Sequence, residues 1–287
     1  MARCAMSARI VMATCRAYPD LSKSNLVLAD ALKAAGATLL TAPWNGPDQA
    51  SFHDNDLVLL RQTWDYMDDP GGFAAWALWL DRAGARIETA PGLAIWNNDK
   101  RTLSALGDAG FAVPHTLPAE PADGFRDICG DRLVIKPVFG GSGVGVRLST
   151  PATREADMAA AMADMPGRTF LVQDYLPGIR DGEWKMTCIG SRVAFALRLV
   201  PAAGEFRVNS RFGPQIAPAD PPAAAVEGAE AILDWLHPAP VLARVDGVMQ
   251  DGRFVCTELE LCDPDLGFHL VPRHHAGAAA QAVLAAL

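Results

Sequence analysis

The sequence predicts an α/β domain at the N-terminus, followed by a larger α+β region. Two observations support this prediction. Over the first 95 residues, short apolar runs alternate with amphipathic helical patterns, which is typical of βαβ units around a parallel sheet. After about residue 130, apolar strands follow one another through short turns, which favours antiparallel pairing. The chain has 287 residues and 50% of them are hydrophobic, so it can form more than one core.

Strand and helix patterns alternate in the N-terminal part. Strands are expected over 9–15, 37–42 and 56–61, and helices over 26–35 and 72–83. Ser22 or Ser24 is placed to cap the first of these helices. A further helix is expected over 98–109, with its cap among residues 97–99.

The second half is predicted to consist of strands with helices packed on them. Strands are expected over 133–137, 144–148, 169–175, 183–189 and 192–200, and in a closing hairpin over 241–250 and 253–261. Helices are expected over 151–164, over 224–236 and in the Ala-rich C-terminal segment. A Pro- and Ala-rich segment, 214–224, leads into the second of these helices.

Composition argues against several classes of protein. Lys and Arg number 25 against 33 Asp and Glu, a net charge of −8, which is unlike a general nucleic-acid binder. No apolar run approaches the roughly 20 residues that cross a bilayer, and no signal-peptide pattern opens the chain. A cytoplasmic protein is therefore expected. Its cysteines show no CxxC or zinc spacing and are expected to be reduced and mostly buried; they are Cys4, Cys15, Cys129, Cys188, Cys256 and Cys262.

A glycine-rich loop over 139–146 is the first candidate site. Its glycines allow close approach of a ligand and can present backbone N–H groups to phosphate oxygens. The next element is predicted to be a strand and no Gly-Lys-Ser/Thr follows, which excludes a Walker A loop and a Rossmann fingerprint. The alternative is a flexible hairpin tip. Lys136, on the apolar strand before the loop, favours an anion site because a buried lysine is costly without an anionic partner.

The closing hairpin carries three carboxylates, Asp246, Glu258 and Glu260. A strict two-residue turn at 251–252 would put Asp246 opposite Thr257 and the glutamates on the other face. One extra residue, as in a three-residue loop, would make Asp246 face Glu258. Converging carboxylates repel one another unless a cation lies between them, and their oxygen ligands favour Mg²⁺ or Mn²⁺. A solvated acidic face is the alternative.

A third group of polar residues lies in the strands between these two sites. Lys185 is inside an apolar strand, and Arg207 and Asn209 alternate to one side of an extended segment. The alternative is an exposed strand face with a salt bridge. The histidines form no metal-binding or Ser/His/Asp pattern, so a catalytic histidine is not expected.

Together these residues form five ordered motifs that resemble the ATP-grasp superfamily, most closely its glutathione synthetase-like branch, over about residues 95–270. The motifs are Asn98-Asp-Lys100, Val134-Ile-Lys136-Pro with the glycine loop, Gln173-Asp-Tyr-Leu-Pro177 with Asp181-Gly-Glu183, Glu205-Phe-Arg207-Val-Asn209, and Asp246 with Thr257-Glu258-Leu-Glu260. The first 90 residues fit the N-terminal domain of the family only in pattern. The Glu-Leu-Glu-Leu and Gly-Glu-Trp stretches resemble a subgroup that includes the O-ureido-serine cyclo-ligase of cycloserine biosynthesis.

The resemblance implies a three-part ATP-grasp architecture. Its parts are an N-terminal α/β domain over 1–95, a central lid subdomain with the glycine-rich flap over 96–168, and a C-terminal ATP-grasp subdomain over 169–287.

The resemblance also implies the roles of single residues. The ATP phosphates are assigned to Lys100, Lys136 and the flap residues Gly141, Ser142 and Gly143. Adenine is assigned to the backbone of a hinge formed by Gln173, Asp174, Tyr175 and Leu176, and the ribose to Glu183. The transferring phosphoryl group would face Lys185 and Arg207. The metals would lie among Asp246, Glu258 and Glu260, near Asn209, and substrate contacts are assigned to Arg207 and Asn209.

Two of these positions depart from the glutathione synthetase pattern. Lys185 stands where that pattern has arginine, and Glu260 stands where it has asparagine. A carboxylate at position 260 still suits Mg²⁺. The departure means that the substrate cannot be inferred from glutathione synthesis.

The implied reaction is ATP- and Mg²⁺-dependent formation of a C–N or similar acyl bond. A small-molecule carboxylate is phosphorylated to an acyl phosphate, and a nitrogen nucleophile displaces phosphate. An intramolecular cyclo-ligase acting on an amino-acid derivative is one alternative. A nucleotide-binding module without turnover is another, but the complete set of Lys, Arg and carboxylate groups counts against it.

The expected partners are amino-acid-like small molecules. No nucleic-acid or membrane partner is expected. The sequence leaves both a monomer and a homo-oligomer as alternatives. Acceptor specificity is expected in loops 14–20, 61–70 and 210–220. The aromatic segment 64–66 is either a substrate loop or a packed turn.

Overall fold

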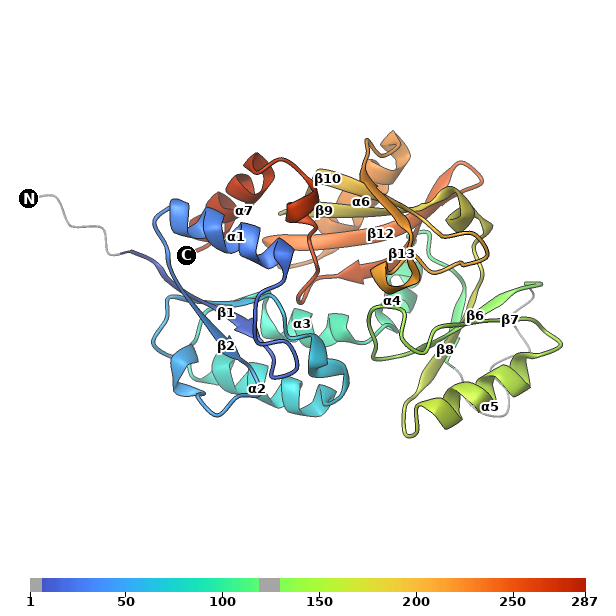
Figure 1. The fold of residues 1–287 in the computed structure, drawn as a ribbon, viewed down its shortest axis with the longest axis horizontal. Coiled ribbons are helices and arrows are strands. Elements are labelled where there is room, and N and C mark those ends of the chain that lie inside the picture. The colour runs from blue at the N-terminus through green and yellow to red at the C-terminus, as the bar shows by residue number, and fades with distance from the viewer. Residues whose placement is uncertain (1–6, 119–129) are drawn as a thin grey trace, which may run out of the picture.

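The computed structural model describes residues 7–118 and 130–287 of the chain. These residues form three sheets that follow one another along the sequence (Figure 1). The first sheet is parallel and has the strand order β2-β1-β3-β4. The second has the order β5-β8-β6-β7 and the third the order β11-β10-β9-β12-β13, and both are antiparallel. The predicted change from parallel to antiparallel pairing is confirmed.

The N-terminal sheet forms around β1 and β3, whose residues are mostly apolar and buried and are covered on both faces. Its strands are β1 (Arg9–Thr14), β2 (Thr38–Pro43), β3 (Leu57–Leu60) and β4 (Ile87–Glu88), and its first two helices are α1 (Lys23–Ala34) and α2 (Pro70–Arg82). Ser22 caps α1 by accepting the N–H of Asn25 at 3.3 Å, which confirms the first of the two predicted caps. The short strand β4 was not predicted.

The last helix of the chain returns to the N-terminal sheet. α7 (His274–Ala285) packs beside α1 on one face, and α2 covers the other face (Figure 1). Ala276, Ala280 and Val283 of α7 share a core with Leu28 and Leu32 of α1. The first and the last helix therefore stabilise the same face of this sheet.

One predicted helix is wrong in its boundaries. In place of a single helix over 98–109, the chain forms α3 (Pro91–Asn98) and α4 (Thr102–Asp108). The backbone at Asp99 is extended, and the N–H of Lys100 donates to the carbonyl of Val138 at 3.1 Å. This bond to the end of a strand replaces the helical bond and fixes Lys100 between the two helices.

The middle sheet carries the glycine-rich loop. Its strands are β5 (Thr116–Pro118), β6 (Leu133–Pro137), β7 (Arg147–Ser149) and β8 (Phe170–Asp174), with α5 (Arg154–Asp164) packed on one face. β7 begins three residues later than predicted because residues 141–145 form turns, with positive φ at Ser142, Gly143 and Gly145. The boundary predicted at residue 168 falls just before β8, which completes this sheet.

The C-terminal sheet forms the largest core together with α4 and α6. Its strands are β9 (Glu183–Ile189), β10 (Arg192–Val200), β11 (Gln215–Pro218), β12 (Leu242–Gln250) and β13 (Arg253–Glu260), and α6 is Ala223–Trp235. β11 lies in the Pro- and Ala-rich segment, where no strand was predicted. It is an exposed edge strand, a position that tolerates proline.

Short 3₁₀ helices complete the described chain. They are η1 (Ala50–Phe52), η2 (Trp64–Met67), η3 (Pro177–Asp181), η4 (Ser210–Phe212) and η5 (Phe268–Leu270).

The predictions about membrane spans and cysteines can be checked for the described residues. Within 7–118 and 130–287, no helix combines the length and the apolar character that crossing a membrane requires. Cys15, Cys188, Cys256 and Cys262 are buried free thiols, as predicted. Cys4 and Cys129 lie outside the described residues.

Candidate active site

Two neighbouring cavities lie where residues of all three sheets meet. The larger, of about 720 Å³, is lined by the glycine-rich loop, β13 and segment 64–68. The smaller, of about 150 Å³, is lined by segment 173–176, β9 and segment 206–209. Both cavities are lined by Lys136, Lys185, Val208, Asn209, Thr257 and Glu258. The two cavities are therefore parts of one site.

The extra residue in the closing hairpin does not lie where the sequence analysis placed it. Its turn at 251–252 has two residues, and Gly247 lies opposite Cys256. The register then shifts by one, so that Asp246 lies opposite Glu258. The extra residue is therefore a bulge at Thr257 in the middle of β13, and the three-residue loop is wrong.

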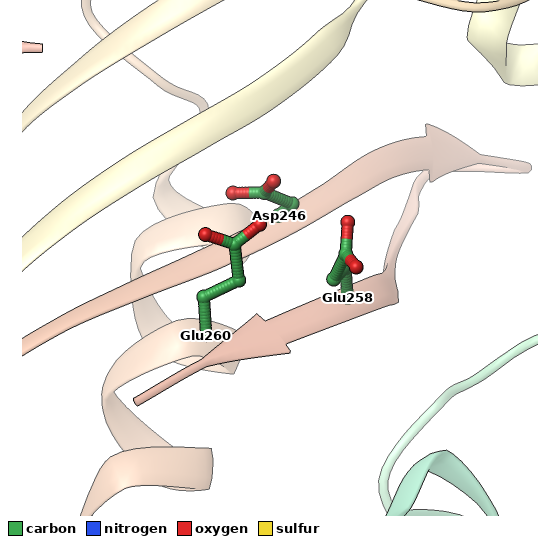
Figure 2. Close-up of side chains that lie close together, drawn as sticks. All are labelled: Asp246, Glu258 and Glu260. Atoms are coloured by element: carbon green, nitrogen blue, oxygen red, sulfur yellow. The ribbon is translucent and has the colours of Figure 1, made fainter. Parts of the chain in front are cut away.

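The bulge gathers the three carboxylates on one side of the hairpin. Asp246 lies on β12, and Glu258 and Glu260 lie on β13, with their side chains directed to the same face (Figure 2). One oxygen of each residue lies within 4.8 Å of the others. The prediction that Asp246 faces Glu258 with Glu260 alongside is confirmed.

Two cations neutralise the buried side of this cluster. Nζ of Lys185 lies 2.9 Å from Oδ2 of Asp246. Arg244 donates from Nε to Oδ1 of Asp246 at 2.7 Å and from Nη2 to Glu260. Arg244 is only 6% exposed, so its guanidinium is enclosed by the carboxylates it binds.

The pKa values of the carboxylates in this cluster differ. Burial raises the pKa of Glu260 to about 7, and the charges of Glu258 and Asp246 add to this effect. Burial also opposes ionisation of Glu258, but Lys100 and other lysines lower its pKa to about 2. Lys100 forms an ion pair with Glu258. An anionic ligand that draws Lys100 away would leave Glu258 free to bind a cation.

The donor set of the cluster fits a hard divalent cation. Every candidate ligand atom in Asp246, Glu258 and Glu260 is an oxygen, and the three side chains approach one point. Mg²⁺ is bound in this way, by a few carboxylates together with water and substrate oxygens.

Lys136 is a buried lysine for which no ion pair is formed within the described residues. The residue is 8% exposed and lies at the floor of both cavities. Within the described residues it forms no ion pair closer than 4 Å. Burial lowers its pKa to about 8, and the charge of Lys100 acts in the same direction. Such a group is expected where an anionic ligand binds.

The glycine-rich flap lines the larger cavity and lies close to two other parts of the chain. A Cβ atom at Gly143 would lie 2.4 Å from Oδ1 of Asn209, and one at Gly141 would lie 3.0 Å from Cε of Met67. The flap therefore lies next to Met67 on one side and Asn209 on the other. Larger side chains at these positions would push it open.

The predicted hinge lines the smaller cavity. The N–H groups of Asp174 and Tyr175 are used by carbonyls of the same protein, at 3.0 and 3.2 Å. No hydrogen bond within residues 7–118 and 130–287 uses the N–H of Leu176. This donor is available to a ligand in the cavity.

Gln173 and Glu183 line the same cavity. The amide of Gln173 donates to the Thr116 hydroxyl at 2.7 Å. Glu183 accepts the hydroxyl of Thr257 at 2.9 Å and lies 3.7 Å from Nζ of Lys185. The bulge residue thus fixes the glutamate that is predicted to contact the ribose.

Arg207 is already paired in this structure. Its guanidinium binds Glu205 at 2.7 and 3.0 Å and lies 3.7 Å from the centre of the Phe212 ring. It lines the smaller cavity, whereas Asn209 lines both. The predicted role of Arg207 at the phosphoryl group stays a prediction.

Two family models match separate parts of this chain. Residues 10–89 match the family model described as D-cycloserine synthetase DcsG, N-terminal domain. Residues 113–238 match the model described as prokaryotic glutathione synthetase, ATP-grasp domain. The chain has the ATP-grasp fold. Its resemblance to the glutathione synthetase-like branch is confirmed.

Individual relatives of this ATP-grasp protein are distant. A glutathione synthetase from Ralstonia nicotianae is 29% identical over 55% of the chain and 49% of its own length. The chain thus spans about half the length of this curated relative. The crystal structure of D-cycloserine synthetase DcsG superposes with a TM-score of 0.81 at 22% identity, over 97% of this chain and 99% of that one. D-alanine–D-alanine ligase from Bacillus anthracis gives 0.70 at 17% identity, over 97% of each chain.

Two buried charged residues that line the larger cavity, Arg244 and Asp263, were not singled out from the sequence. Arg244 had a detectable signal, because it stands two residues before Asp246 and so lies on the same face of the strand. Asp263 had none, since its partner Thr63 lies 200 positions earlier in the chain.

Proposed function

We propose that this ATP-grasp protein is an ATP- and Mg²⁺-dependent ligase that activates the carboxylate of a small molecule and transfers it to a nitrogen nucleophile. The observation that carries the proposal is one continuous site that joins a buried lysine, a glycine flap and three carboxylates. Lys136, which forms no ion pair within the described part of the chain, lines the same cavity as the flap and Glu258. The names of its relatives support the reaction class, and one structure of the Bacillus anthracis ligase holds ATP.

The nucleotide is proposed to occupy both cavities. The smaller cavity takes adenine against segment 173–176, where the N–H of Leu176 is free to donate. Glu183 accepts a ribose hydroxyl at the same place. The phosphates extend into the larger cavity, where Lys100 and Lys136 neutralise them and backbone N–H groups of 141–143 donate to their oxygens.

The reacting groups are proposed to meet beside the hairpin. Mg²⁺, held by Asp246, Glu258 and Glu260, would neutralise phosphate charge and orient the phosphates. Lys185 and Arg244 are charged groups on the same face and stabilise negative charge as the γ-phosphoryl group moves.

The proposed chemistry balances in two steps. A carboxylate oxygen of the substrate attacks the γ-phosphorus, and the bond from that phosphorus to the β-γ bridging oxygen breaks to release ADP. The lone pair of a nitrogen then attacks the acyl carbon, and phosphate leaves as the nitrogen loses a proton. Closure of the glycine-rich flap over the larger cavity would keep water from the acyl phosphate.

An intramolecular cyclo-ligase is the second candidate. The match of residues 10–89 to the N-terminal domain of D-cycloserine synthetase favours it. Tyr18 and segment 64–68 of that domain line the larger cavity, so the matched part helps to form the substrate site. In this reaction the acid and the nucleophile belong to one amino-acid derivative.

Isotope transfer tests the acyl phosphate. With a substrate labelled with ¹⁸O in its carboxyl group, we expect label in the released inorganic phosphate and ADP as the other product. The reason is that the attacking carboxylate oxygen stays with phosphorus when nitrogen displaces it. Mass spectrometry of the phosphate and chromatography of the nucleotides provide the measurement. AMP with pyrophosphate, or unlabelled phosphate, would overturn the mechanism.

Binding of the nucleotide is expected to depend on the divalent cation. Mg·ATP at 100 times its Kd should stabilise the protein by about 2.7 kcal/mol, since a ligand that binds only the native state shifts the unfolding equilibrium. Thermal unfolding with ATP and EDTA is the control and should show a smaller shift. An unchanged melting temperature at millimolar Mg·ATP would exclude the proposal.

A further inference from the structure

Two buried charges on the walls of the larger cavity have no ion-pair partner within the described residues. One is Lys136, and the other is Asp263, which is 8% exposed. The buried carboxylates Glu183 and Asp246 each lie within 4 Å of a lysine or arginine. Buried charges are costly unless they are paired. The phosphates would pair with Lys136, which leaves the carboxylate of Asp263 to be explained.

The surroundings of Asp263 satisfy it only in part. Its Oδ2 accepts the hydroxyl of Thr63 at 2.7 Å, and the backbone N–H of Thr63 also interacts with the carboxylate, which leaves part of its four lone-pair sites unused. Arg61, behind the cavity wall, attracts Asp263 electrostatically but forms no ion pair with it. Its guanidinium donates instead to Asn25 and to the carbonyl of Pro264. The carboxylate therefore retains acceptor capacity.

Aromatic side chains stand beside this carboxylate. Nε1 of Trp64 donates to the carbonyl of Asp263 at 3.2 Å, which fixes the ring on the cavity wall. Tyr18 meets Trp64 edge-on with ring centres 5.7 Å apart. Both rings line the larger cavity, and aromatic faces attract cations. This wall is therefore suited to a positively charged group.

We propose that Asp263 binds a primary ammonium group of the substrate, so that the substrate is an amino acid or an amino-acid derivative with a free amine. The inference rests on the proposed ligase function. The substrate carboxylate lies toward Arg244 and Lys185, and its ammonium lies at Asp263. Opposite charges on two walls of one cavity then orient the molecule before the reaction.

The test compares amines with matched substrates that lack them. Wild-type ADP release is measured with L- and D-forms of the common amino acids, alone and in pairs, and with the corresponding 2-hydroxy acids. The best amino acid is then used with Asp263→Asn, which keeps the acceptor for Thr63 and removes the charge. We expect its KM to rise about tenfold to a hundredfold, with kcat and the KM for ATP within about twofold.

The control removes an equal charge from a position outside the site. Asp30 is exposed on α1 and lines neither cavity. Asp30→Asn is expected to change the KM for the amino acid by less than about threefold. A 2-hydroxy acid, where it is turned over at all, should show the same KM with wild type and Asp263→Asn.

Several results would overturn the inference. These are an unchanged KM in Asp263→Asn, equal use of amino and hydroxy acids by the wild type, or no turnover of any amino acid although Mg·ATP stabilises the protein. If Asp263→Asn does not fold, the wild-type comparison of amino with hydroxy acids decides. Absence of Mg·ATP binding is a separate result, which removes the proposed function and with it this inference.

Discussion

Replacing Glu258 with glutamine is expected to lower turnover by about a hundredfold or more while ATP still binds. Glu258 lies at the centre of the site, opposite Asp246, and lines both cavities. Its pKa, lowered to about 2 by the neighbouring lysines, keeps it charged at neutral pH. Glutamine preserves the size of the side chain but removes the charge that would hold Mg²⁺. Steady-state ADP release with Mg·ATP measures the effect.

The variant needs a second readout and a matched control. The additional thermal stabilisation by Mg²⁺, over that by ATP with EDTA, should be smaller in Glu258→Gln than in the wild type. Glu227 is exposed on α6, away from both cavities, and Glu227→Gln should leave turnover and stabilisation unchanged. Turnover at the wild-type level in Glu258→Gln would mean that the acidic face is only solvated.

Replacing Lys136 with methionine is expected to weaken ATP binding by about 1.5–3 kcal/mol, the loss of one charged hydrogen-bonding partner. The fold should persist without nucleotide, because methionine fills the same apolar path and no ion pair within the described residues is broken. The lowered pKa of Lys136 supports this, since burial already disfavours its charge. Calorimetric titration with Mg·ATP and thermal unfolding measure the two effects.

A control variant separates charge in the site from charge in general. Lys33 is exposed in the last turn of α1, and Lys33→Met should bind Mg·ATP like the wild type. The two readouts for Lys136→Met distinguish a ligand-binding lysine from a packing one. Normal ATP affinity together with early melting would show that Lys136 serves only the fold.

The family motifs could be recognised from the sequence because each is local. Lys136 stands on an apolar strand next to four glycines, and this pattern needs no knowledge of distant contacts. The same is true of Glu258 and Glu260, which alternate on one strand. The strand periodicity also predicted most elements of the antiparallel region.

Helix boundaries were harder to predict where a distant bond intervenes. The segment around Lys100 has a continuous helical pattern, yet its N–H bonds to Val138, which is 38 positions away. The strand β11 was not predicted because its own residues do not show a strand pattern. It forms because the chain reverses direction after β10 and pairs with that strand at the edge of the sheet. In both cases the deciding hydrogen bond joins segments whose approach is not encoded in the local pattern.

The sequence by itself determined the order of strands and helices, the change from parallel to antiparallel pairing, and the residues that form the ATP-grasp motifs. The tertiary structure decided how those residues meet. The bulge at Thr257, not the turn, sets the face of the carboxylates, and Arg244 is enclosed by them. Asp263 and Thr63 come together because a segment after the last strand packs against the N-terminal sheet. Periodicity reports which side of an element is buried, whereas register and packing depend on the free energy of contacts between segments far apart in the chain.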